Sequence, residues 1–212
     1  MKPNIKICGI TNFEDAAAAV KLGADFIGLN FFADSPRGLT PDDAANLAGE
    51  IKHTFPRISL VGVFVDETVE KTRLIAEICE LDVLQFHGNE SPEFCAQFEQ
   101  NVWRAFRVKN ENSFEDLQQF LELDGIVLDA FKRGQFGGTG QTFDWKLIHK
   151  IRDELPFFIL AGGLNPKNIE RAIIQLSPDV VDICSGVEVR GDPRRKDVKK
   201  MEQLFEVVKK LS

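Results

Sequence analysis

The chain has 212 residues, of which 43% are hydrophobic and 28% charged, so it can bury a core without disulfides or a structural metal. Its formal net charge is −7, and acidic residues interrupt its densest basic run, residues 190–200, which argues against a nucleic-acid partner. The four cysteines form no CxxC pair, and no apolar run approaches the roughly 18 residues of a membrane span, so we expect neither a zinc site nor a membrane protein.

Eight short runs rich in Val, Ile, Leu and Phe recur along the chain without clean polar alternation. This pattern is typical of parallel strands that are buried on both faces. Helix-start patterns alternate with them, for example Thr11 with Glu14 three positions on, and Pro41 followed by two acidic residues. The predicted strands are 5–8, 26–30, 59–65, 83–86, 103–108, 125–128, 157–160 and 180–184, and predicted helices start near residues 11, 41, 66, 91, 112, 143, 165 and 196.

Dividing 212 residues among eight strand–helix units gives about 26 residues each, near the lower limit for a closed barrel. We therefore predict an α/β protein, a single-domain (β/α)8 TIM barrel with a parallel eight-stranded sheet that spans residues 1–212. An open doubly wound sheet is the alternative, but it usually has about five or six strands. The absence of a leftover segment or a Gly/Ser-rich linker favours the closed barrel.

Glycine-rich loops follow the seventh and eighth predicted strands, with Gly162-Gly163 in one and Ser185-Gly186 in the other. Glycine lets backbone N–H groups approach an anion closely, and these are the loops that usually bind phosphate in a barrel. Either pair alone would be explained by a tight turn. Two such loops on adjacent strands favour a phosphorylated ligand.

A third glycine-rich segment, residues 134–140, follows the sixth strand. Its spacing matches neither a dinucleotide-binding fingerprint nor a Walker A loop. Two interpretations remain open: a lid that closes over the substrate and contacts it through Gly138, or a plain flexible loop.

Cys8 and Asp129 end the first and sixth strands, and the mouth of a barrel is where catalytic groups lie. Cys8 is either an inert packing residue or an accessible thiol that acts as a base or nucleophile. Asp129 is either a capping or salt-bridged residue, paired with Lys132 or Arg133, or a general acid. Because strands one and six lie across the ring from each other, the two side chains would bracket a small substrate.

Three further candidates are Arg37 in the loop after the second strand, His87 at a strand end and Asp182 inside the barrel. The planar fork of Arg37 suits a substrate carboxylate, although a surface arginine is the more ordinary case. His87 ends the fourth strand and would orient the substrate or titrate near neutral pH, unless it is simply structural. Asp182, inside the eighth strand, would touch the ligand or hold another side chain.

Taken in order, these motifs resemble the phosphoribosylanthranilate isomerases of tryptophan biosynthesis, and the resemblance covers nearly the whole chain. The matching segments are Lys-Ile-Cys-Gly-Ile-Thr (6–11), Ser-Pro-Arg (35–37), Val-Gly-Val-Phe (61–64), Gln-Phe-His-Gly (85–88), Leu-Asp-Ala (128–130), Gly-Gly-Thr-Gly-Gln-Thr-Phe-Asp-Trp (137–145), Leu-Ala-Gly-Gly-Leu-Asn-Pro (160–166) and Asp-Ile-Cys-Ser-Gly-Val-Glu (182–188).

The resemblance implies an Amadori rearrangement of N-(5-phosphoribosyl)anthranilate to 1-(2-carboxyphenylamino)-1-deoxyribulose 5-phosphate, with no metal and no cofactor. By this resemblance Asp129 is the general acid, Cys8 is the general base and Arg37 holds the anthranilate part. It also assigns the phosphate to Gly162, Gly163, Ser185 and Gly186, and places His87 and Asp182 in the pocket.

The expected partner is a phosphorylated small molecule, with no nucleic acid and no membrane, and the expected assembly is a monomer or homodimer. The N-terminal residues lack the long apolar run of an export signal, so we expect a cytoplasmic protein.

Three positions depart from the family pattern: Gln141 where Lys is frequent, Phe86 where Leu is frequent, and Cys184 where a second Ser is common. The first would affect lid closure, and none touches the expected acid or base. Two rival functions remain. One is an aminoimidazole-carboxamide ribonucleotide isomerase, which typically uses two aspartates, and Cys8 argues against it. The other is a catalytically silent phosphate-binding scaffold, which would need neither Cys8 nor Asp129.

Overall fold

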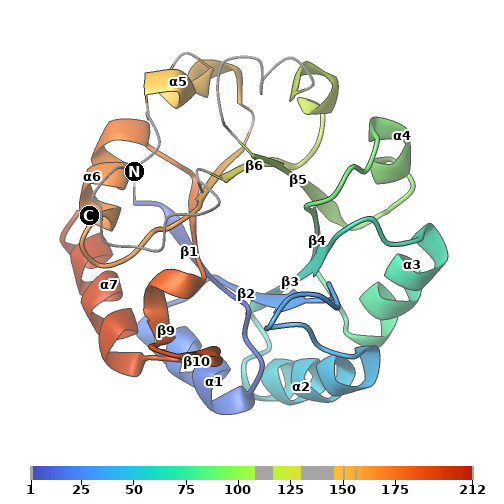
Figure 1. Cartoon of the computed structure of the whole chain (residues 1–212), viewed down its shortest axis with the longest axis horizontal. Helices are drawn as coiled ribbons and strands as arrows, with labels where there is room; N and C mark the ends of the chain where they lie inside the picture. The colour runs from blue at the N-terminus through green and yellow to red at the C-terminus, as the bar shows by residue number, and fades with distance from the viewer. Residues whose placement is uncertain (1, 108–116, 130–145, 150, 156, 212) are drawn as a thin grey trace.

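Eight parallel strands close into one barrel in this computed structural model, which describes residues 2–107, 117–129, 146–149, 151–155 and 157–211. The strands follow each other around the ring in chain order, and the last pairs with the first (Figure 1). They are β1 (Asn4–Cys8), β2 (Phe26–Asn30), β3 (Ser59–Phe64), β4 (Val83–Phe86), β5 (Asn101–Arg107), β6 (Gly125–Asp129), β7 (Phe158–Ala161) and β8 (Val180–Ile183). The predicted closed barrel is confirmed.

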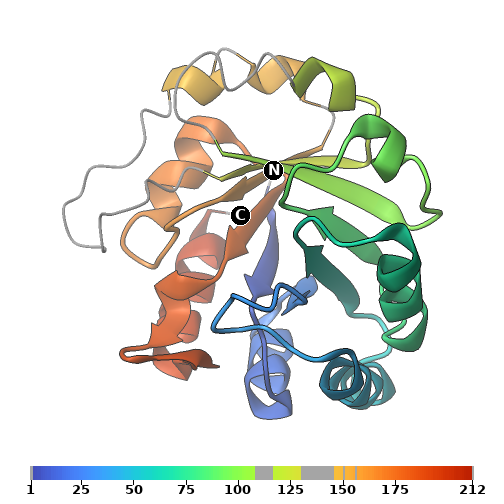
Figure 2. The same cartoon turned by 45° about the vertical axis from the view of Figure 1, so that its right-hand side comes forward.

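The helices lie outside the ring and cover its outer face (Figures 1 and 2). Side chains such as Ile51, Leu84 and Phe205 fill the layer between the strands and these helices. The helices are α1 (Phe13–Leu22), α2 (Pro41–Thr54), α3 (Val69–Ile78), α4 (Pro92–Cys95), α5 (Lys146–His149), α6 (Ile169–Leu176) and α7 (Val198–Lys210), with the 3-10 turns η2 (Leu117–Phe120), η3 (Arg152–Glu154) and η4 (Ser185–Val187).

Short polar side chains start several helices where the sequence predicts a start. Asn12, Thr40 and Thr68 each accept a hydrogen bond from a backbone N–H in the first turn of α1, α2 and α3. The segment between β4 and β5 is less regular, because α4 has only 4 residues. The helix starts predicted near residues 112 and 143 lie outside the described residues.

A short antiparallel hairpin, β9 (Glu188–Val189) and β10 (Asp192–Lys196), follows β8. The sequence-based prediction has only a loop after the eighth strand, and the structure adds the hairpin to it. Gly191, with a φ of 85°, makes the turn, since a left-handed backbone favours glycine. The hairpin sets Lys196 opposite Glu188, and it lies outside the ring of strands, beside α1 (Figure 1).

One kind of contact repeats four times at the N-terminal end of the barrel. An aspartate just before each even-numbered strand accepts the backbone N–H of a residue in the preceding odd-numbered strand, at 2.7–2.8 Å. These bonds satisfy strand-end donors that have no partner in the sheet. The pairs are Asp25 with Ile5, Asp82 with Leu60, Asp124 with Val102, and Asp179 with Phe158.

The inside of the barrel is apolar towards that end. Val61, Val127 and Ile159 pack there with Trp103, whose ring centre lies 5.1 Å from that of Phe26. Side chains alternate between the two faces of a strand, so residues two positions further along also point inward. By this alternation, the residues that point inward change from apolar at this end of the barrel to polar at the other end.

Candidate functional site

Cys8 is the last residue of β1. It therefore lies at the mouth, defined here as the end of the barrel where the strands finish. Lys6, two positions earlier, is fully buried, and its Nζ lies 2.8 Å from Oδ2 of Asp182 on β8. Because Lys6 and Cys8 share one face of β1, the thiol belongs to the same interior as this ion pair. The expectation that Cys8 lies at the mouth is met in the described geometry.

Asp129 ends β6, and its Oδ2 lies 3.5 Å from Nε2 of His87, which follows β4. β4 and β6 are not neighbours, since β5 lies between them, so the two side chains meet across the inside of the barrel. The separation is that of an ion pair without hydrogen-bond geometry, and both side chains are about one-fifth exposed. Sequence reasoning alone does not find this pairing. The alternative partners Lys132 and Arg133 lie outside the described residues.

Asp182 connects the two sides of the mouth electrostatically. Its burial raises the pKa to about 6, while the ammonium of Lys6 and the charge of His87 act in the opposite direction. Its Oδ1 atom is buried and finds no hydrogen-bond partner among the described residues. A buried acceptor of this kind is costly unless something pairs with it, which suits contact with a ligand hydroxyl.

Cys8 lies in surroundings that favour its charged form. A hydrogen bond from the Cys184 thiol and the nearby Lys6 and Lys196 ammonium groups hold the pKa of Cys8 well below its usual value, against the effect of burial. The same contact and burial raise the pKa of Cys184. A thiolate at the end of a barrel strand is a competent general base.

Arg37 is not a free surface arginine. Its Nε and Nη2 both donate to the carboxylate of Glu188, with Nη2 at 2.8 Å from Oε2. This bidentate pair raises the pKa of Arg37. It uses two of the five N–H donors of a guanidinium, about half of its capacity. The opposite edge, formed by Nη1 and the second Nη2 hydrogen, has the geometry to receive another carboxylate.

Glu188 is the centre of this cluster. Its Oε1 also lies 3.1 Å from Nζ of Lys196, a side chain with no exposed surface. Lys196 reaches the cluster because the β9–β10 hairpin sets it opposite Glu188. Sequence reasoning misses Lys6, Glu188 and Lys196, although the alternation of β1 offered a signal for Lys6, which shares a face with Cys8.

The two glycine loops predicted to hold phosphate lie against each other. A Cβ atom on Gly186 would collide with the carbonyl oxygen of Leu164, which places the loop after β8 tightly on the loop after β7. Gly162 and Gly163 both have positive φ, 92° and 66°. Such a backbone favours glycine, and the close approach of two loops at one strand end suits an anion site. Ser185 is exposed at the start of η4.

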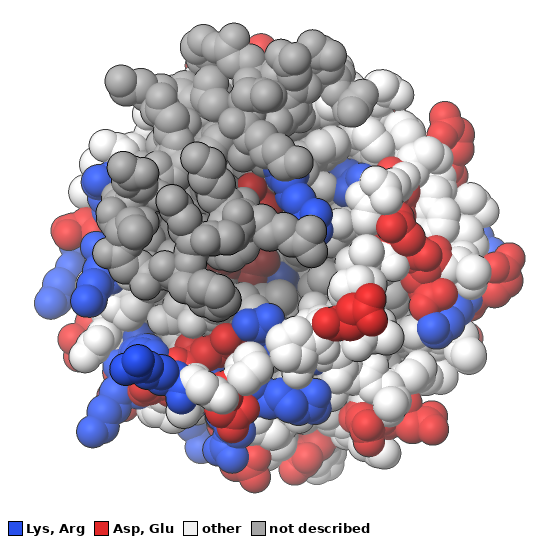
Figure 3. Space-filling view, in the orientation of Figure 1, with Lys and Arg blue, Asp and Glu red and all other residues white. Residues whose placement is uncertain are grey.

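Gly138 and the rest of the predicted lid lie outside the described residues. In the part of the chain that the structure describes, no group of three or more His, Cys, Asp or Glu side chains is arranged to hold a metal. Over the same residues, no helix is long and apolar enough to cross a membrane. Acidic and basic side chains are interspersed over the mouth face (Figure 3).

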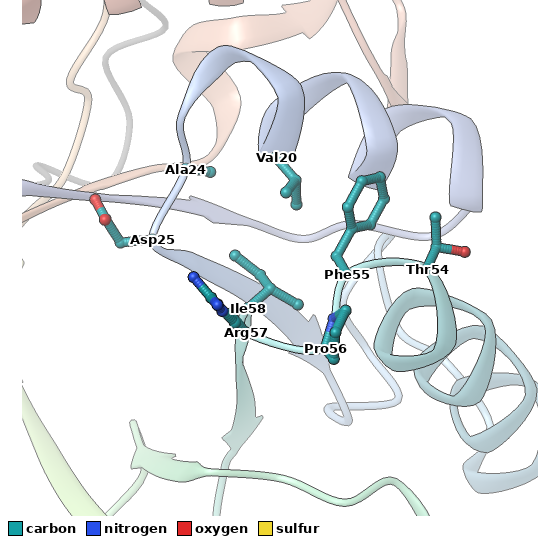
Figure 4. Close-up of a pocket in the computed structure, with 8 residues that line it drawn as sticks. All are labelled: Val20, Ala24, Asp25, Thr54, Phe55, Pro56, Arg57 and Ile58. Atoms are coloured by element: carbon teal, nitrogen blue, oxygen red, sulfur yellow. The ribbon is translucent and has the colours of Figure 1, made fainter.

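A groove of about 420 Å³ lies at the other end of the barrel, between the end of α1 and the segment from α2 to β3 (Figure 4). Its polar side chains include Asp25, which already accepts the Ile5 N–H. Residues at this end of a barrel serve stability, so we place the site at the mouth.

Comparison with known proteins identifies relatives over nearly the whole chain. The profile of the N-(5'-phosphoribosyl)anthranilate (PRA) isomerase family matches residues 5–207. The N-(5'-phosphoribosyl)anthranilate isomerase of Geobacter sp. strain M21 is 40% identical over 208 residues, covering 98% of each chain.

Two solved structures are similar at the level of the fold. A structure of monomers generated from the dimeric enzyme of Thermotoga maritima superposes with a TM-score of 0.86 at 36% identity, covering 98% of this chain and 99% of that one. A phosphoribosylanthranilate isomerase in complex with reduced 1-(o-carboxyphenylamino)-1-deoxyribulose 5-phosphate gives a TM-score of 0.87 at 37% identity, with the same coverage.

Proposed function

Because this chain belongs to the PRA isomerase family and catalyses its Amadori rearrangement in tryptophan biosynthesis, we propose that Cys8 and Asp129 perform the two proton transfers of that reaction. The single observation that carries this proposal is the pair of contacts that turn both groups into one interior. Lys6, which pairs with Asp182, lies on the same face of β1 as Cys8. Asp129 contacts His87 on the inside of the barrel.

The first step opens the ribose ring. Asp129 in its protonated form donates a proton to the ring oxygen, the C1–O bond breaks, and the anthranilate nitrogen supplies the electron pair that forms the C1=N bond. The neighbouring His87, 3.5 Å from Asp129, is placed to hold the carboxylate that remains.

The second step moves the proton of C2. The positively charged C1=N bond acidifies this hydrogen, so a base of moderate strength can remove it. The thiolate of Cys8 accepts the proton, and the C2–H electrons form a C1=C2 double bond while nitrogen recovers its pair. Tautomerisation of the resulting enol gives the ketone, and in this second step the substrate nitrogen acts as the electron sink.

The remaining residues hold the two anionic ends of the substrate. The free edge of Arg37 takes the anthranilate carboxylate, and Gly162, Gly163, Ser185 and Gly186 take the phosphate. Asp182, with its unpaired buried oxygen, contacts a sugar hydroxyl.

We also propose that the whole chain, residues 1–212, works as one barrel domain in the cytoplasm, without nucleic-acid or membrane partners. The assembly is a monomer or a homodimer, as a relative is described as a dimer that also yields monomers. Light scattering of the purified protein measures this assembly directly.

The test of the catalytic roles is fluorescence-monitored turnover of phosphoribosylanthranilate by three proteins: wild type, Cys8→Ala and Asp129→Asn. Each variant should lose at least about 100-fold in kcat, the lower end of a general acid–base contribution. Both should bind the reduced product analogue almost as well as the wild type, because the phosphate loops are unchanged. Turnover close to wild type in either variant contradicts the role of that residue.

Two controls separate the rival functions. Offering the imidazole aminoaldose beside phosphoribosylanthranilate tests the related isomerase, and activity on the imidazole substrate alone would contradict our assignment of roles. Arg37→Ala should lower the affinity for the carboxylated product analogue by about 10-fold or more, as expected for a lost charge-assisted hydrogen bond. Equal affinity before and after this change would remove Arg37 from the carboxylate site.

A further inference from the structure

Cys184 directly follows β8, beside Cys8 on β1. In the register of these two strands Lys6 is opposite Asp182 and Ile7 is opposite Ile183. One residue further along each strand, Cys8 lies beside Cys184. A Cβ atom on Gly9 would lie 3.1 Å from Sγ of Cys184, so this sulfur rests against the turn that follows Cys8.

The Cys184 side chain is fixed by charged neighbours from the hairpin. Nζ of Lys196 lies 3.9 Å from its Sγ and 3.3 Å from its carbonyl oxygen. Oε1 of Glu188 lies 3.6 Å from the same sulfur and accepts from the thiol. The single thiol hydrogen therefore has two acceptors within reach, Glu188 and the sulfur of Cys8.

We propose that Cys184 is a positioning residue for the isomerisation: its S–H group donates to the Cys8 thiolate and keeps the base ready to remove the C2 proton. When Cys8 takes up that proton, its sulfur becomes a weak acceptor, and the Cys184 hydrogen turns to Glu188. Cys184 itself neither gains nor loses a proton. The proposal rests on the role of Cys8 given under the proposed function.

Other charges also act on the thiolate, and they limit how much Cys184 contributes. Lys6 and Lys196 also stabilise the Cys8 thiolate, so the thiolate keeps two stabilising charges when the Cys184 hydrogen bond is removed. The Cys184 hydrogen bond nevertheless also lowers the pKa of Cys8. The charged groups that face the two thiols are Lys6 on β1, Asp182 on β8, Glu188 on β9, Lys196 on β10 and Arg37 after β2.

The experiment compares wild type with Cys184→Ala and Cys184→Ser. The rate of alkylation of Cys8 by iodoacetamide is measured against pH by peptide mass spectrometry, and kcat/KM is measured over the same pH range. Cys8 and Cys184 fall in different tryptic peptides, bounded by Lys6 and Lys21 and by Arg171 and Arg190. Cys79→Ala is the matched control, because Cys79 is a buried cysteine that directly follows α3. Burial raises the pKa of Cys79 to about 11.

For Cys184→Ala the alkylation midpoint should rise by about one to two pH units, the equivalent of one hydrogen bond to a charged group. The acidic limb of kcat/KM should rise with it, and turnover should recover at high pH. Cys184→Ser should stay close to wild type, since a hydroxyl also donates, and Cys79→Ala should leave both curves in place.

Three results overturn the proposal, and they are distinguishable. An unmoved alkylation midpoint in Cys184→Ala, while Cys8→Ala remains inactive, refutes the positioning role alone. A raised midpoint with an unmoved limb in kcat/KM refutes both this role and the assignment of Cys8 as the base. Loss of activity at every pH in both variants indicates a merely structural side chain and also overturns the proposal.

Discussion

Gly28 leaves the space that the Cys8 side chain occupies. A Cβ atom at this position of β2 would lie 2.9 Å from Sγ of Cys8, 3.0 Å from its Cα and 3.2 Å from Cε of Lys6. A contact under 3.0 Å forces a displacement, so the Cys8 thiol must move, and the end of the Lys6 side chain is crowded as well.

We expect Gly28→Ala to lower kcat by about 10- to 100-fold, because small misplacements of a catalytic group have effects of this size. The control is Gly49→Ala on α2, where an added Cβ meets nothing within 4 Å. That change should leave turnover intact and add up to about 1 kcal/mol of stability, as alanine favours a helix over glycine. Steady-state kinetics and urea unfolding of the two variants check both expectations, and a fully active Gly28→Ala protein would show that Cys8 needs no such space.

The pKa of Asp182, about 6, carries a pH dependence of its own. Since this value lies above that of an unfolded chain, about 3.9, the group favours folding below pH 4 and loses that contribution as the pH rises through 6. Lys6 lowers the pKa of Asp182, so Lys6→Met should raise it above 6. Carbon-13 NMR titration of the Asp182 carboxyl in both proteins is the measurement. A lower midpoint in Lys6→Met would contradict the opposing effects of burial and ion pairing.

At the scale of the elements, the four aspartates before β2, β4, β6 and β8 tie the strands together in pairs. Asp25 accepts the Ile5 N–H at 2.8 Å, at the end of the barrel away from the chemistry. Asp25→Ala should therefore lower the free energy of unfolding by about 1–3 kcal/mol, through an unpaired backbone N–H group, and leave kcat unchanged. Urea unfolding monitored by circular dichroism measures the loss. Asp153→Ala, on the exposed turn η3, is the control and should change stability by less than about 0.5 kcal/mol.

Sequence patterns predict the strands well because apolar runs bounded by turn residues are local. The predicted and observed bounds of β2 and β4 are identical, and those of β1 and β6 differ by one residue. The hairpin β9–β10 was missed, since the polar segment 188–196 has no apolar alternation and its pairing depends on the Gly191 turn.

The site residues show the same difference between local and long-range features. Strand ends are local features, and they correctly indicated where Cys8, His87 and Asp129 would lie. Partners are not local: the contact of Arg37 with Glu188 joins residues 151 positions apart. Such a contact depends on the closure of β1 onto β8 and on the hairpin, and neither of these is written in the neighbouring residues. The roles of the predicted site residues therefore stay predictions until the variants are measured.

At the scale of the whole molecule, a closed barrel has no free sheet edge, so a ligand at the mouth should stabilise the other end as well. A ligand present at about 100 times its Kd adds about 2.7 kcal/mol to the native state. For a chain of this size the reduced product analogue should then raise the Tm by about 5–10 °C. Thermal unfolding by circular dichroism measures the rise, and hydrogen exchange at Ile5 and Leu60 tests whether the far end shares it. Protection confined to the loops of the mouth would indicate separate halves.

The ion pair between Lys6 and Asp182 joins the first strand to the last, 176 positions apart in the chain. A nascent or refolding chain whose eighth strand has not yet docked has no such pair, and it also lacks the second thiol beside Cys8. The surroundings that lower the pKa of Cys8 are therefore assembled by the same event that closes the barrel. We therefore expect incompletely folded molecules to carry an ordinary cysteine at this position, and the form with the lowered pKa to appear only when the ring is complete.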